Sequence, residues 1–167
     1  TSFGISESRY GFLPTTNALM VVFLQYAVTQ VTKRFKALPV MAAGTAFYAL
    51  AVSLVAFSRG YWGFWVCMVI MTIGELIISP TATTYTAALA PADMRGRYMS
   101  IYGLTWSAAM GIAPVVGGSL SDKFGPRSTW YGGAVLGIAA VMAYVLLKNK
   151  SERGKSNSHP GTQGSGE

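Results

Sequence analysis

The feature that most constrains this chain is a series of five apolar stretches, each long enough to cross a lipid bilayer. A spanning helix needs about 20 predominantly apolar residues. The stretches that qualify are residues 13–31, 38–57, 62–90, 98–120 and 129–147. Backbone N–H and C=O groups in hydrocarbon must bond within their own segment, so such stretches form helices rather than open strands. The sequence therefore predicts an all-α integral membrane protein with about five transmembrane helices.

The charge content supports a membrane protein and argues against a soluble one. Only 11% of the residues are charged, against about 25% in a typical soluble domain. The net charge of +7 is spread in short bursts between the apolar stretches, which is typical of membrane loops and not of a nucleic-acid surface. We therefore expect no nucleic-acid partner. Residues 1–147 form the membrane part, and residues 148–167, rich in Ser, Gly and Lys, are predicted to be a disordered tail.

The placement of Lys and Arg predicts the orientation, because cytoplasmic loops carry an excess of both. With five spans, one side of the membrane holds nine basic residues: Lys33, Arg34, Lys36, Arg95, Arg97, Lys148, Lys150, Arg153 and Lys155. The other side holds four: Arg9, Arg59, Lys123 and Arg127. We therefore predict a multi-pass protein of the cell (plasma or inner) membrane with a cytoplasmic C-terminus. An outside N-terminus without a signal sequence indicates that further sequence precedes residue 1.

The inventory of reactive side chains argues against an enzyme or a metalloprotein. Cys67 is the only cysteine, and His159, in the polar tail, is the only histidine. A membrane enzyme would need a converging nucleophile, base or set of metal ligands inside the spans. We predict no catalytic residue, no metal site and no cofactor.

Three stretches of the sequence, in order along the chain, carry a family resemblance. The first is Tyr10-Gly11-Phe12-Leu13 with Asn17 and Gln25. The second is Gly74-Glu75, Ser79-Pro80, Ala90-Pro91 and Arg95-Gly96-Arg97. The third is Ala113-Pro114-Val115-Val116-Gly117-Gly118, followed by Phe124-Gly125-Pro126-Arg127. Together they resemble the helix entries, helix exits and cytoplasmic loops of the major facilitator superfamily.

Two departures from the family pattern refine the resemblance. Ala113 stands where the family's antiporter motif has Gly, and the loop from Thr32 to Pro39 lacks the Asp-x-x-Gly-Arg signature found between the second and third helices. The second departure favours the C-terminal half of the major facilitator superfamily (MFS) fold. The five spans then resemble helices eight to twelve, which belong to one MFS-type six-helix half-bundle. The resemblance then implies a secondary transporter that works by alternating access, with the N-terminal half of the same protein missing here.

The resemblance also implies a small-molecule substrate bound between the two halves near the midplane. We expect proton-coupled efflux, as in drug-efflux-like members. The alternative is a small oligomeric membrane scaffold or channel subunit that assembles through its glycine-rich faces.

Glu75 is the strongest candidate for a functional residue, because it is the only acid well inside a span. An ionisable side chain at that depth usually faces a partner or a water-filled cavity. It could couple protons, or it could be a structural carboxyl bonded to a neighbouring helix. Thr72 and Ser79 lie on the same helical face. Asn17 and Gln25 form a similar stripe on the first span, so both stripes line a cavity or bond helices to each other.

Small residues predict where helices pack closely. Gly103, Ser107 and Gly111 repeat every four residues, and Gly133 and Gly137 form a GxxxG pattern. Gly117 and Gly118 after Pro114 mark either a flexing point or a packing kink of the fourth span.

Aromatic and basic residues complete the candidates. Tyr102 and Trp106 could line the cavity for an amphipathic substrate. Arg95 and Arg97 belong to a cytoplasmic loop, where they set the topology or join a gate.

Overall fold

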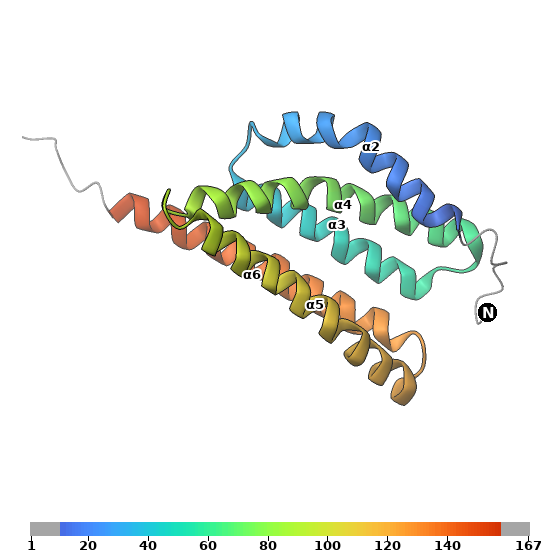
Figure 1. The fold of residues 1–167 in the computed structure, drawn as a ribbon. Helices are drawn as coiled ribbons and strands as arrows, with labels where there is room; N and C mark the ends of the chain where they lie inside the picture. Colours follow the sequence, from blue (N-terminus) through green and yellow to red (C-terminus); the bar gives the residue numbers. More distant parts are fainter. Residues whose placement is uncertain (1–10, 158–167) are drawn as a thin grey trace, which may run out of the picture.

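The computed structural model describes residues 11–157, with side chains up to Arg153, and shows five helices in an up-and-down bundle (Figure 1). The helices are α2 (Phe12–Thr32), α3 (Ala37–Phe57), α4 (Gly60–Leu89), α5 (Arg95–Phe124) and α6 (Ser128–Asn157). All five are long and apolar enough to cross a membrane, which confirms the predicted all-α membrane fold. Tyr10 of the first motif and the end of the tail, residues 158–167, lie outside the described residues.

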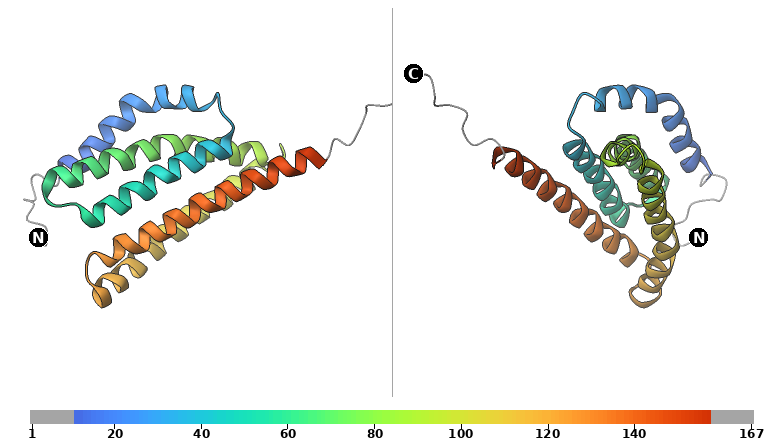
Figure 2. Two further views of the ribbon diagram at one scale, coloured as in Figure 1. Left: turned by 180° about the vertical axis from the view of Figure 1, so that it is seen from behind. Right: turned by 60° about the vertical axis from the view of Figure 1, so that its left-hand side comes forward.

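The bundle has two parts. Helices α2, α3 and α4 lie together, and α5 and α6 form a hairpin that diverges from them toward its loop (Figures 1 and 2). Helix α3 connects the two parts, because it packs extensively against both α4 and α6. Helix α2 packs on α4, on the side away from α6.

Two glycines allow α3 and α4 to cross at close range. A Cβ atom added at Gly44 would lie 3.1 Å from the carbonyl oxygen of Gly74, and one added at Gly74 would lie 2.8 Å from the carbonyl oxygen of Gly44. The Tyr48 ring would also lie 2.9 Å from a Cβ at Gly74. Small residues at a helix crossing let the backbones approach, which is the main source of packing energy between helices in lipid.

The GxxxG pattern of α6 lies against α3. A Cβ atom at Gly137 would lie 2.8 Å from Cβ of Ala49, and one at Gly133 would lie 2.9 Å from a methyl group of Val52. These two glycines therefore form the contact face that joins the hairpin to the rest of the bundle.

Helix α5 contributes no buried residue to this bundle. Within the described part of the chain, nothing lies within 4 Å of a Cβ added at Gly103, Gly111 or Gly118. Near its C-terminal end α5 is joined to α6 by a hydrogen bond: the Thr129 hydroxyl donates to the carbonyl oxygen of Gly117 at 2.9 Å. The predicted packing role of the Gly103–Gly111 face has no partner here and stays a prediction.

The C-terminal end of α6 differs from the sequence expectation. The apolar stretch ends near residue 147 and a disordered tail was expected from Lys148, whereas the helix continues to Asn157. Lys, Glu and Arg are good helix formers, so the helix can continue into water after the apolar stretch ends. Lys36, in the loop between α2 and α3, forms an ion pair with Glu152 of this extension, at 3.6 Å.

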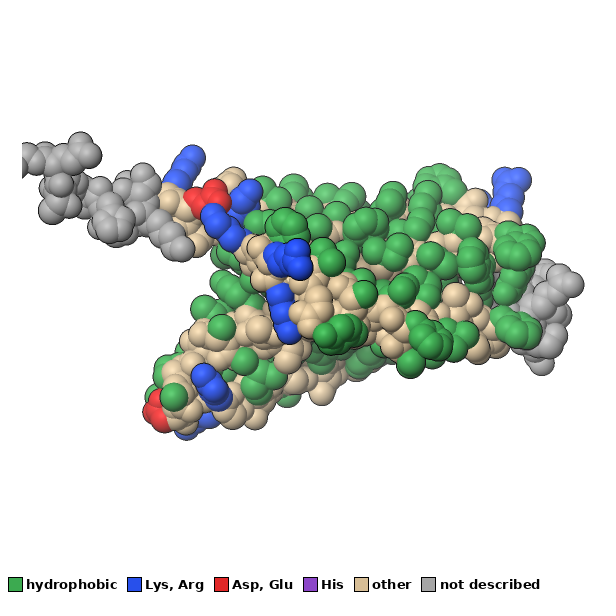
Figure 3. Space-filling model, turned by 90° about the horizontal axis from the view of Figure 1, so that it is seen from above, with side chains coloured by type: hydrophobic (Ala, Val, Ile, Leu, Met, Phe, Trp, Pro, Cys, Tyr) green, Lys and Arg blue, Asp and Glu red, His purple; other side chains and the backbone are tan. Residues whose placement is uncertain are grey.

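Charged side chains lie at the ends of the bundle and hydrophobic ones cover its length. In Figure 3 most blue side chains gather toward the end from which the C-terminal segment leaves, and the middle of the visible face is largely green. This distribution fits a bundle whose flanks face hydrocarbon and whose ends face water.

Candidate functional site

The polar stripes of α2 and α4 meet in the described structure. The Asn17 amide donates hydrogen bonds to the Thr72 hydroxyl and to the Glu75 carboxylate, both at 2.9 Å. Thr72 is fully buried, and Asn17 and Glu75 are partly buried. The structure therefore brings three of the predicted candidates into one cluster, which we call the Asn17–Glu75 cluster.

The surroundings of Glu75 decide what its carboxyl group can do. Among the described residues no Lys or Arg forms an ion pair with it, since the one salt bridge found there joins Lys36 and Glu152. The phenol of Tyr48, on α3, is close enough to interact electrostatically with the carboxylate. The Glu75 carboxylate therefore has amide and hydroxyl neighbours and no compensating positive charge among the described residues, and burying an unpaired charge is costly.

A second polar contact lies closer to the Lys33 end of α2, where Pro80 interrupts the hydrogen bonding of α4. Proline has no N–H, so the carbonyl group four residues earlier, on Leu76, loses its helical partner. The Gln25 amide donates to this carbonyl at 3.3 Å and also to the Thr29 hydroxyl at 3.1 Å. Leu76 is only 1% exposed, so Gln25 supplies the donor that water cannot.

A third contact was not foreseen from the sequence. The indole N–H of Trp65 on α4 donates to the Thr16 hydroxyl on α2 at 3.2 Å. Trp65 also packs edge-on against Trp62, which in turn packs against Tyr61. The only signal for this contact was the Tyr and Trp content at the start of α4, which indicates a membrane interface but not a bonding partner.

Ser79 lines an open hollow of about 380 Å³ between α2 and α4, shared with Gln25, Thr29, Pro80, Thr83 and Thr84. The remaining candidates lie elsewhere. Tyr102 on α5 lies near Tyr144 of α6, and Trp106 is 46% exposed. Arg95 and Arg97 are exposed at the start of α5.

The candidate residues therefore form two groups. One lies along the contact between α2 and α4, which we call the seam, and the other lies on α5. Asn17, Thr72 and Glu75 share hydrogen bonds across the seam, whereas Gln25 and Ser79 lie nearer its Lys33 end. No group of three or more His, Cys, Asp or Glu side chains able to hold a metal ion occurs in residues 11–157. The groups available in the seam are one carboxyl group, two amides and several hydroxyls, joined by hydrogen bonds.

Comparison with protein families gives one match over nearly the whole chain. The model of the Major Facilitator Superfamily matches residues 1–165. No solved structure gives a significant match.

Comparison with curated proteins gives transporters. An uncharacterized MFS-type transporter of Methanocaldococcus jannaschii is 33% identical over 107 residues, which are 64% of this chain and 28% of that protein. The uncharacterized MFS-type transporter YttB of Bacillus subtilis is 31% identical over 159 residues, 92% of this chain and 39% of that protein. A Na(+), Li(+), K(+)/H(+) antiporter of Planococcus maritimus is 26% identical over 141 residues, 82% of this chain and 31% of that protein. The chain thus spans between about a quarter and two fifths of the length of these relatives.

Proposed function

The chain belongs to the major facilitator superfamily, and we propose that it supplies most of the C-terminal half of a proton-coupled transporter that exports small molecules by alternating access. Members of this family are carriers and not enzymes, and the relatives described above are named as transporters or antiporters. Family membership also favours transport over the alternative of an oligomeric scaffold or channel subunit. The missing partner in this proposal is the N-terminal half of the same transporter, since the relatives are two to four times longer than the matched segment.

The observation that carries the proposal is the environment of Glu75. Its carboxylate accepts a hydrogen bond from Asn17 and has no basic counter-ion among the described residues. A carboxyl group held this way inside a span can be neutral when protonated and is costly when bare. Asn17 lies on a different helix, so a change in the charge of Glu75 changes a contact between α2 and α4.

A second candidate cargo is a monovalent cation. The antiporter of Planococcus maritimus is named for exchange of Na(+), Li(+) and K(+) against H(+). The oxygen atoms of Glu75, Thr72 and Asn17 are hard ligands of the kind that alkali cations accept, as other hard cations do. Export of a small molecule and export of a monovalent cation would both depend on the Glu75 carboxyl group. In the first case it carries only the proton, and in the second a proton and a cation compete for it.

The orientation belongs to the same proposal. The basic residues lie mostly at the end of the bundle from which the C-terminus leaves, which favours a cytoplasmic location of this end in a multi-pass cell-membrane protein. Arg95 and Arg97 then lie at the cytoplasmic surface.

Glu75→Gln in the complete transporter tests the proposal. Vesicles containing a pH-sensitive dye receive a pulse of NaCl or of ethidium, and proton movement is followed with wild type and variant at equal folded amounts. We expect the pulse to move protons in wild type and not in Glu75→Gln, because Gln keeps the size and hydrogen bonding of Glu but carries no proton.

Glu152→Gln is the matched control, since Glu152 lies outside the apolar core of its helix and is half exposed. Equal proton movement in wild type and Glu75→Gln would leave Glu75 a structural carboxyl and end the coupling proposal. Whether NaCl or ethidium triggers the response identifies the cargo class.

A further inference from the structure

A pocket at the Lys33 end of the seam carries an inference that is independent of proton coupling. It is a hollow of about 220 Å³ between the end of α2, the following loop and the second half of α4. The lining residues are Thr29, Thr32, Lys33, Phe35, Ala37, Pro80, Thr81, Thr84, Tyr85 and Ala88. It shares Thr29, Pro80 and Thr84 with the hollow next to Ser79, so the two form one continuous depression.

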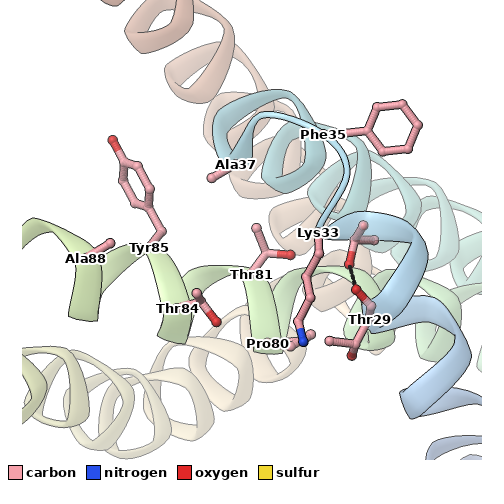
Figure 4. Close-up of a pocket in the computed structure, with 10 residues that line it drawn as sticks. Thr29, Lys33, Phe35, Ala37, Pro80, Thr81, Thr84, Tyr85 and Ala88 are labelled. Carbon is pink, nitrogen blue, oxygen red and sulfur yellow. Dashed lines mark hydrogen bonds between the residues drawn. The ribbon is translucent and has the colours of Figure 1, made fainter.

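The charge and donor content of this depression fits an anion. Lys33 is its only charged lining residue, and no acidic side chain lines either part. Figure 4 shows the Lys33 side chain running along the pocket, with its ammonium group close to Pro80. No salt bridge or hydrogen bond to this ammonium group occurs within residues 11–157.

Some of the neighbouring hydroxyl groups already donate hydrogen bonds within the protein, and others do not. Thr29, Thr32 and Thr81 each donate to a backbone carbonyl of their own helix. The hydroxyls of Thr84 and Ser79 make no hydrogen bond within the described part of the protein, although Thr84 belongs to both hollows. The pocket thus offers the ammonium group of Lys33 and the free hydroxyl of Thr84, donors of the kind that bind phosphate, and the Ser79 hydroxyl lies in the adjoining hollow.

The depth of the pocket in the bilayer indicates what carries the anion. Tyr61, Trp62 and Trp65 form an aromatic cluster at the start of α4, which marks one membrane interface. Crossing about 30 Å of hydrocarbon takes about 20 residues of helix, so the opposite interface lies near Pro80. The pocket begins at Pro80 and extends to Ala88, which places it at the level of the phospholipid headgroups.

The walls add a preference for an amphipathic ligand. Phe35, Ala37, Pro80 and Ala88 contribute apolar surface to the lining of the pocket, although the Phe35 ring points away from the Lys33 ammonium group in Figure 4. Other basic residues at the same end, including Arg34 and Arg95, raise the local concentration of anions. We propose that this pocket is a binding site for a phosphate group, held by Lys33 and Thr84, and that the phosphate of a phospholipid fits it better than free phosphate does.

Binding of dihexanoyl phosphatidic acid to the complete transporter in a neutral detergent tests the proposal, with native mass spectrometry as the readout. Inorganic phosphate is titrated in parallel. We expect Lys33→Gln to weaken binding of the lipid about tenfold, which corresponds to about 1.4 kcal/mol. Thr84→Val should weaken it less, and Lys33→Arg should restore most of it because the cation returns.

Lys36→Gln is the matched control, since Lys36 lies in the same loop and is paired with Glu152. The melting temperature without ligand should be the same for all variants, because both lysines are exposed. Inorganic phosphate that binds as tightly as the lipid, with the same dependence on Lys33, would support the phosphate site and assign it to the soluble anion. Equal losses in Lys33→Gln and Lys36→Gln, or no loss in either, would overturn the proposal.

Discussion

Replacing Gly137 by leucine is expected to separate α6 from α3. A Cβ atom at this position would lie 2.8 Å from Cβ and 3.1 Å from Cα of Ala49. Carbon atoms in good contact are about 3.5–4.0 Å apart, so the two helices would have to move apart by about 1 Å. One of the two atoms belongs to the backbone of α3, so no change of rotamer can relieve the overlap.

The magnitude follows from two opposing effects. Overpacking of a well-fitted contact costs about 1–3 kcal/mol, and replacing Gly within a helix returns up to about 1 kcal/mol of helix propensity. For Gly137→Leu we expect a net loss of about 1–2 kcal/mol, seen as a fall in melting temperature of the purified protein in detergent.

Gly111→Leu is the matched variant. Gly111 also lies inside a helix and in a stripe of small residues, but nothing among residues 11–157 lies within 4 Å of a Cβ atom there. We expect no fall in melting temperature for this variant. Equal falls for both would show that a segment outside these residues packs on α5, and an unchanged Gly137→Leu variant would refute the assignment of the α3–α6 contact.

Two further predictions concern the Pro80 break and the orientation. Gln25→Leu should destabilise the protein by about 0.6–2 kcal/mol, because the Leu76 carbonyl loses its donor. Pro80→Ala restores a backbone N–H, so in a double-mutant cycle of thermal stability the loss from Gln25→Leu should be smaller in the Pro80→Ala background. Full additivity of the two losses would contradict the hydrogen bond from Gln25 to the Leu76 carbonyl. A reporter active only in the cytoplasm should be active when fused after Lys150, whereas activity of a periplasmic reporter at that position would reverse the proposed orientation.

The spans were predictable because hydropathy alone determines them. Each predicted stretch lies within or close to one helix of the structure, and helix ends differ by a few residues except in α6. The extension of α6 to Asn157 was missed because a Lys- and Ser-rich segment without apolar residues has no burial signal. Lys, Glu and Arg within it permit a helix, and Glu152 forms an ion pair with Lys36, but its Asn, Ser and Gly residues give no strong helix signal in the sequence.

Partner choice between helices was not predictable from patterns of small residues. The stripes at Gly103–Gly111 and Gly133–Gly137 look equivalent in the sequence, yet only the second meets another described helix. The crossing of Gly44 and Gly74 has no repeat to reveal it, because Gly44 is the one glycine of α3 and Gly74 has no glycine three or four residues away in α4. Whether a glycine contacts another helix depends on which helices are neighbours, and the arrangement of the whole bundle determines this, not the local sequence.

The sequence predicted which residues form polar stripes on α2 and α4, but not which of them are hydrogen-bonded to each other. The sequence indicated that Asn17 and Glu75 each lie on a polar face, whereas their bond at 2.9 Å depends on the register of α2 against α4. The bond from Gln25 to the Leu76 carbonyl could have been anticipated in part, since Pro80 must leave that carbonyl without its helical donor.

The two kinds of contact imply different mechanical roles for the helices. At Gly44–Gly74 and at Ala49–Gly137 the backbones approach within the reach of a single Cβ atom, and a gap of about 0.5–1 Å already removes a quarter to a half of the attraction between contacting atoms. The seam between α2 and α4 depends instead on the side chains of Asn17, Gln25 and Trp65, whose hydrogen bonds contribute about 1 kcal/mol each. A carrier that opens and closes must separate helices somewhere, and the energetics favour the polar seam over the glycine contacts. We therefore predict that α3, α4 and α6 move as one unit during transport and that α2 moves against them at the seam.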